Sequence, residues 1–189
     1  GEKSWLVQAE GTARTVAEKF KAESAGFLSG LPNPGSPVQP TRQLEENIKA
    51  ARLFNLLSQY TGDDYFRSNA EHAMRFLATK EVALSRIEDS GILIAATEMA
   101  QSAVHLTVVG GKDDANAKEL FRVGMNQPGW YKRLEWWDKS EGPLRNPDVS
   151  YPSYDRAAGF VCVERTDCVF RRRQEFRSNW HRSFVYRGW

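Results

Sequence analysis

The sequence has little of what would assign a function at once. It has 189 residues, among them two cysteines, and its formal net charge is +2. Two cysteines are too few for a disulfide scaffold, and a charge this small does not by itself indicate nucleic acid binding. No apolar run reaches the roughly 20 residues of a membrane-spanning helix. The sequence therefore does not favour a disulfide-rich, nucleic-acid-binding or membrane protein.

The chain also lacks a signal peptide and an initiator methionine, and a helical pattern begins soon after Gly1. We therefore expect a fragment or a processed product. The length is enough for one domain or one and a half. Folding at this size buries roughly 70% of the surface of the chain, so no disulfide or metal is needed to hold the fold together.

The strongest pattern is a pair of amphipathic helices over residues 42–77. Apolar side chains recur at three- and four-residue intervals on either side of the segment Thr61-Gly62-Asp63, which places them on one face of each helix. Gly62 is expected to end the first helix, because glycine enters the left-handed backbone region at low cost. A turn this short predicts that the two helices lie antiparallel.

Polar residues at the helix ends predict the caps. Thr41 is expected to cap the first helix, and Asp63 or Asp64 the second. Glu45 and Glu46 lie in the first turn, where carboxylates favour the positive end of the helix dipole.

Further helices are expected on both sides of this pair. One covers residues 5–22, and a loop follows over residues 26–40 because four prolines interrupt it. Another helix runs from about residue 89 to 100. Its run over residues 92–96 is apolar all round, which predicts a buried helix.

From residue 104 the pattern changes to short strands. Strands are expected over residues 104–109, 131–137 and 158–163. A helix capped by Asp113 or Asp114 separates the first two strands. Strand, glycine turn, helix and strand form a β-α-β unit, and such crossovers favour parallel pairing.

The predicted fold class is mainly α with a small α/β part. We expect a helical hairpin region over residues 1–102, a small α/β module over residues 103–170, and a basic, aromatic tail over residues 171–189. Arginine and aromatic side chains together suit RNA, through phosphate contacts and stacking. The acids upstream leave the chain nearly neutral, however, so nucleic acid is not the expected partner.

Several short stretches resemble one protein family. They are Glu46-Asn47, Ala50-Ala51-Arg52-Leu53, Tyr60-Thr61-Gly62-Asp63, Leu106-Thr107-Val108-Val109-Gly110 with Asp113-Asp114, Tyr151-Pro152, and Ala158-Gly159-Phe160-Val161-Cys162 before Cys168. Over about residues 40–170 the order of these pieces resembles proteins with an N-terminal thioredoxin-like domain and a helical toroid, of the YyaL and spermatogenesis-associated protein 20 type.

The resemblance implies a partial (α/α) toroid of helical hairpins, followed by a short β-α-β module. This chain would be the C-terminal end of such a protein, without the thioredoxin-like domain and its redox motif. Two features depart from the family. Five residues separate Cys162 from Cys168 where relatives usually keep four, and the end of the chain is rich in arginine.

Cys162 and Cys168 have three interpretations: buried structural thiols, a disulfide, or redox or metal chemistry. A catalytic dithiol normally has two intervening residues at a helix start, whereas here five follow a strand. With His181 the cysteines would supply three zinc ligands, but the spacing fits no common zinc module and a fourth ligand is missing. We favour structural thiols, with the disulfide as the second interpretation.

Glu45, Glu46, Asn47 and His72 are the candidate ligand-binding residues, with the loop over residues 26–40 beside them. Chemistry on sugars needs two carboxylates across a cleft, and epimerases of toroid shape use histidine bases. The simpler interpretation is that helix starts collect acids for the dipole alone, and that the histidine is a surface residue or is wedged between apolar neighbours.

The leading hypothesis is a non-catalytic structural and interaction portion of a thioredoxin-associated helical-toroid protein, with no catalytic residue, cofactor or metal. The alternative is part of a carbohydrate-processing, epimerase-like enzyme cleft with a carbohydrate-like ligand. A toroid that lacks some of its helices exposes an apolar face. We therefore expect self-association or binding to another protein chain.

Overall fold

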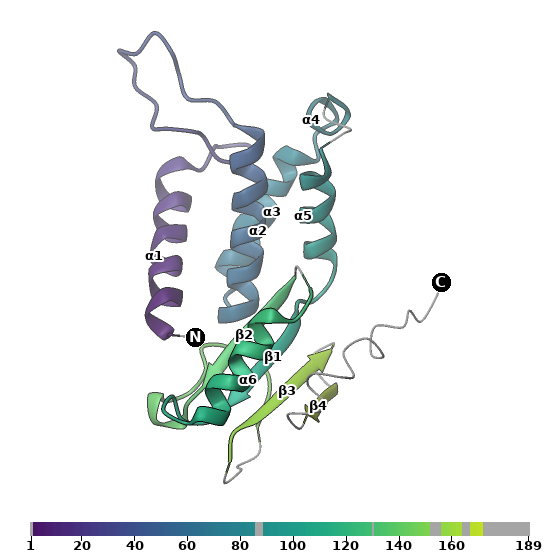
Figure 1. Cartoon of the computed structure of the whole chain (residues 1–189). Coiled ribbons are helices and arrows are strands. Elements are labelled where there is room, and N and C mark those ends of the chain that lie inside the picture. The colour runs from purple at the N-terminus through teal and green to yellow at the C-terminus, as the bar shows by residue number, and fades with distance from the viewer. Residues whose placement is uncertain (1, 86–88, 130, 152–155, 164–166, 172–189) are drawn as a thin grey trace. The chain divides into compact units, whose positions relative to one another are not determined.

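The computed structural model of the chain describes residues 2–85, 89–129, 131–151, 156–163 and 167–171 (Figure 1). At residue 163 and over residues 167–171 it describes the backbone alone. Contacts between residues divide the chain into two compact units, one over residues 2–102 and the other from Ala103 onward. Within the described residues, no helix has the length and apolar character to cross a membrane. The predicted tail lies outside this part of the chain except for Arg171.

The fold is mainly helical with a small mixed sheet, as the sequence predicts. The helical unit contains α1 (Lys3–Phe20), α2 (Leu44–Thr61), α3 (Asp64–Leu77), α4 (Lys80–Ser85) and α5 (Ser90–Ala100). The helices α2 and α3 form its centre (Figure 1). Their shared core contains stacked aromatic rings, with centroids 5.3 Å apart for Phe27 and Phe54 and 6.4 Å apart for Phe54 and Phe66.

The turn between α2 and α3 has the predicted caps. Gly62 has φ of 69° and donates its backbone N–H to the carbonyl of Ser58 at 2.9 Å. The Asp63 side chain accepts a hydrogen bond from the N–H of Tyr65 at 2.8 Å. Both caps are local features, set by residues next to each other in the sequence.

The predicted cap at Thr41 is wrong. Helix α2 begins at Leu44, and its N-cap residue Gln43 makes no side-chain capping bond. The Thr41 backbone instead pairs with Ser29 across the proline-rich loop, because its carbonyl accepts from the Ser29 N–H at 2.9 Å. This pairing holds Thr41 in the loop, before the helix starts.

The prediction that α5 is buried on all sides is also wrong. Only Ala95 and Glu98 of this helix are buried, and Leu93 is 67% exposed. One side of α5 packs on α2, where Arg52 holds both carboxylate oxygens of Glu98 at 2.8 Å. That paired hydrogen bond raises the pKa of Arg52. Leu93, Ala96, Thr97 and Ala100 of α5 are exposed.

The second unit contains β1 (Val104–Val109), α6 (Ala115–Asn126), β2 (Lys132–Trp137), the 3-10 turn η1 (Lys139–Glu141), β3 (Ala158–Val163) and β4 (Asp167–Arg171). The strand order is β2-β1-β3-β4. Strands β1 and β2 are parallel and α6 connects them, as the β-α-β pattern predicts. Strand β3 runs antiparallel to β1, and β4, which the sequence does not predict, runs antiparallel to β3.

The sheet separates two kinds of side chain because successive residues of a strand point to opposite faces. Val108 of β1 packs with Ala117 and Leu120 of α6 on one face. On the other face, Val109 packs with Tyr151 and Phe160. The adjacent tryptophans of β2 follow this alternation: Trp136 contacts Phe121 of α6, while Trp137 contacts Tyr151.

Both ends of α6 are fixed by side chains. Asp114 caps the first turn by accepting from the Asn116 N–H at 2.7 Å. At the other end, the Lys132 ammonium donates to the carbonyls of Gly124, Met125 and Gln127. Burial lowers the pKa of Lys132. A cation at this end also complements the helix dipole.

Candidate functional site

Asn47 and His72 lie together, and both hold the segment Gly26-Phe27. The Asn47 side chain accepts from the Phe27 N–H at 2.7 Å and donates to the Phe27 carbonyl at 3.0 Å. The His72 ring contacts the Gly26 carbonyl at 2.9 Å, and the His72 backbone carbonyl accepts from the Gly26 N–H at 2.9 Å. All four backbone polar groups of the dipeptide are therefore satisfied by α2 and α3. We call this arrangement the Gly26-Phe27 clamp.

Gly26 is required in the clamp for two reasons. Its φ is +75°, a conformation that other residues rarely adopt, and a Cβ added there would lie 2.8 Å from both Asn47 Oδ1 and Phe76 Cβ. The backbone must come this close to let Phe27 enter the core. Phe27 is 3% exposed and stacks on Phe54.

The hydrogen bonds of His72 fix its tautomer. Nε2 must carry the proton, because the Gly26 carbonyl can only accept. Nδ1 must be unprotonated, because it contacts the Arg75 guanidinium at 3.0 Å and a guanidinium can only donate. His72 is therefore neutral in this arrangement. Burial lowers its pKa, the hydrogen bond to Gly26 opposes that shift, and the charges of Lys21 and Arg75 lower the pKa further.

Glu45 and Glu46 do not join this cluster of contacts. Both are exposed in the first turn of α2, whereas Asn47 is fully buried. Both polar atoms of the Asn47 side chain and Nε2 of His72 bind the loop backbone. The four predicted ligand-binding residues thus divide into two exposed carboxylates and two buried residues of the clamp.

A second buried polar cluster lies on the sheet face that Tyr151 covers. His105 Nε2 is 2.7 Å from Glu135 Oε2, and the same oxygen is 2.7 Å from Arg133 Nη2. The other end of the guanidinium binds Asp148 at 2.8 Å. Arg133 is 3% exposed and Glu135 is 6% exposed, so these charges are compensated inside the protein rather than by water.

Thr107 extends this cluster to Tyr151. Its hydroxyl lies 2.9 Å from His105 Nε2 and 2.7 Å from the Tyr151 hydroxyl. Burial raises the pKa of Tyr151 to about 12. Glu135 and Thr107 both meet the same nitrogen of His105, whereas a proton relay needs partners on the two opposite nitrogens. We infer that this cluster fixes the segment ending at Tyr151 onto the sheet.

Sequence reasoning missed this cluster, although a signal for it exists. Both predicted strands carry polar residues at every second position, His105 and Thr107 in one and Arg133 and Glu135 in the other. In the parallel register His105 pairs with Arg133 and Thr107 with Glu135, so the four side chains share one face. The alternation alone does not give this register.

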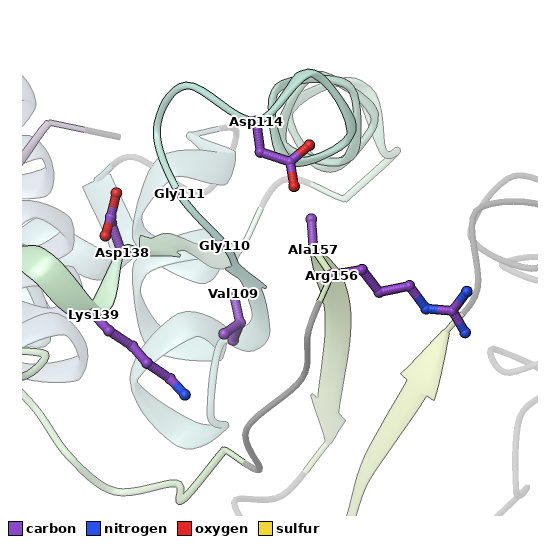
Figure 2. A pocket seen from close by; sticks show the side chains of 8 residues that line it. All are labelled: Val109, Gly110, Gly111, Asp114, Asp138, Lys139, Arg156 and Ala157. Atoms are coloured by element: carbon purple, nitrogen blue, oxygen red, sulfur yellow. The ribbon is translucent and has the colours of Figure 1, made fainter.

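A hollow of about 200 Å³ lies at the carboxyl ends of β1 and β2. Figure 2 shows the residues that line it. Asp114 and Asp138 line it, and both carboxylates hold local turns. Asp138 accepts hydrogen bonds from Ser140 and from the Lys112 N–H, which lower its pKa. In the figure, the Arg156 side chain extends away from Lys139. Two carboxylates at this edge disfavour the phosphate groups that glycine turns before helices often bind.

Cys162 lies in β3, is 1% exposed and is disulfide-bonded. The sequence has one other cysteine, Cys168, and its Cα is the cross-strand partner of Cys162 in the β3–β4 pair. This agrees with the disulfide, the second of the three interpretations of the two cysteines. The favoured interpretation, structural thiols, is wrong for Cys162. No group of three or more metal-ligating side chains occurs among the residues that the structure describes.

Comparison of the chain with models of protein families, with curated proteins and with solved structures gives no match.

The Gly26→Ala substitution tests the clamp. We expect it to lower the free energy of unfolding by about 2–4 kcal/mol, because the new methyl group meets Asn47 and Phe76 and the backbone conformation becomes strained. Urea unfolding followed by far-UV circular dichroism measures this change in free energy.

The matched control is Gly11→Ala, in the middle of α1 with nothing within 4 Å of the added Cβ. It should stabilise the protein by about 0.5–1 kcal/mol. Equal effects of the two substitutions would contradict the clamp.

The neutral state of His72 predicts a loss of stability in mild acid. The pKa of His72 is lowered in the folded state, so below about pH 6.5 the unfolded chain binds a proton that the folded chain does not. The contribution of His72 to the free energy of unfolding should therefore be fully present above this pH. It should be lost as the pH drops toward the pKa of His72 in the folded state. Urea unfolding between about pH 7.5 and pH 5 should show a steeper loss in the wild type than in His72→Gln. Parallel curves for the two proteins would show that His72 is not the titrating group.

Proposed function

We propose that this chain is a non-catalytic structural and interaction portion of a helical-toroid protein of the thioredoxin-associated type. The family resemblance supports the proposal, since its Tyr60-Thr61-Gly62-Asp63 stretch forms the end of α2 and the turn into α3. The internal use of Asn47 and His72 also supports it, because side chains committed to the backbone of Gly26 and Phe27 are not available to a substrate.

The strongest support for the proposal is the composition of the outer face of α5. Leu93, Ala96, Thr97 and Ala100 are all exposed and recur at three- and four-residue spacing. This face has no charged residue, and the only charged residue of α5, Glu98, is buried against Arg52. A charge-free helix face of this kind is typical of a surface that another protein covers.

The alternative function, a carbohydrate-processing cleft, has less support. It requires Glu45, Glu46, Asn47 and His72 to converge on one concave surface. The hollow at the ends of β1 and β2 is lined by none of these residues. The two carboxylates are exposed while Asn47 and His72 are buried, so the four do not offer their polar atoms to one ligand.

Self-association through α5 can be measured directly. Light scattering after size exclusion should give a dimer or larger species for the wild type, because a second copy covers the apolar face. Leu93→Glu should shift the protein to a monomer, since a charge in that interface is left without water.

The matched control is Leu31→Glu in the proline-rich loop, where the leucine is 57% exposed. It should keep the wild-type mass. A monomeric wild type, or the same mass for both variants, would contradict this interface.

A further inference from the structure

Three cations surround the Gly26-Phe27 clamp. The Lys21 ammonium donates to Asn69 Oδ1 at 2.9 Å, and Lys21 pairs with Phe27 through a backbone bridge. Arg42 Nη1 donates to the Ala25 carbonyl at 3.2 Å. Arg75 Nη2 donates to His72 Nδ1 at 3.0 Å. Three separate parts of the sequence thus place a positive charge at the same short loop.

The partners of these cations are all neutral. In the described part of the chain, none of the three takes part in an ion pair. Other cations of the helical unit do pair with acids, as Arg14 does with Asp63 and Arg52 with Glu98. Lys21 and Arg75 are both close enough to His72 for their charges to act on its ring, and Arg42 lies over the ring of Phe76, next to Arg75 in the chain. Positive charges on one loop repel one another, and a bound anion would relieve this repulsion.

The three side chains also keep unused donors at the surface. A guanidinium has five N–H donors and an ammonium has three. Arg42, Arg75 and Lys21 are each exposed and each use one donor in the hydrogen bonds above. The Arg42 guanidinium also lies over the Phe76 ring, 4.8 Å from its centroid, which limits its movement. The cations are thus held in place while most of their donors face water.

We propose that Lys21, Arg42 and Arg75 form a binding site for a dianionic phosphate group. Phosphate offers three acceptor oxygens and two negative charges, which suit two guanidinium groups and an ammonium better than a single carboxylate does. Glu23, exposed in the same loop, weakens the site by repulsion. The phosphate is either free or carried as a monoester, since the same oxygens make the contacts in both.

His72 supplies an internal reporter of the site. Lys21 and Arg75 are close enough for their charges to lower its pKa. A bound dianion offsets these charges, so phosphate should raise the pKa of His72. A change in stability alone would not produce this shift.

The test is a titration of the full chain with inorganic phosphate, followed by NMR of the His72 ring at constant ionic strength. We expect saturable binding and a raised pKa of His72. Arg42→Gln and Arg75→Gln should each weaken binding by roughly fivefold or more, because each removes a charge-assisted contact. Glu23→Gln should tighten it. The matched control is Lys49→Gln, which removes an exposed lysine of α2 and should leave the affinity unchanged.

A short peptide with one phosphoserine, compared with its unphosphorylated form, distinguishes the two sources of phosphate. Tighter binding of the phosphopeptide than of inorganic phosphate would assign the site to phosphorylated ligands, and equal affinity would assign it to the free ion. Failure of the wild type to bind either one saturably would overturn the proposal. An equal loss of affinity in Lys49→Gln and Arg75→Gln would also overturn it, because binding would then follow net charge alone.

Discussion

The helical unit depends on the pairing of one dipeptide backbone with two side chains. Asn47 and His72 satisfy the polar groups of Gly26 and Phe27, so a loop segment enters the space between α2 and α3 without leaving buried donors or acceptors unpaired. The Phe27 ring then completes the aromatic core with Phe54. Without the clamp, burial of this ring would require unpaired amides in an apolar environment.

In the α/β unit, buried charged side chains hold a segment of the chain on the sheet. Arg133 joins Glu135 and Asp148 on a buried sheet face, and this places the segment before Tyr151 over the strands. Such groups cost solvation energy when they are buried, and their mutual attraction offsets that cost only if the geometry is good. Removal of one partner therefore lowers the free energy of unfolding more than replacement of the whole cluster does. In both units the buried polar side chains are used to position a loop.

The sequence predicts the features that neighbouring residues determine and misses those that need distant partners. Gly62 and Asp63 form the expected caps because capping involves residues within one turn. The exposure of Leu93 depends on which helices lie beside α5, and no property of α5 itself gives that information. Asn47 resembles a candidate ligand-binding residue in the sequence, since its partner Phe27 is 20 positions away.

The measurement that tests the clamp most directly is amide hydrogen exchange at Gly26 and Phe27. Both N–H groups are donors to α2 or α3, to the His72 carbonyl and to Asn47 Oδ1. We expect protection similar to that of the core amides of α2 and α3, although the two residues lie in a loop. Exchange at the rate of the exposed residues 31–39 would contradict the claim that this dipeptide organises the helical unit.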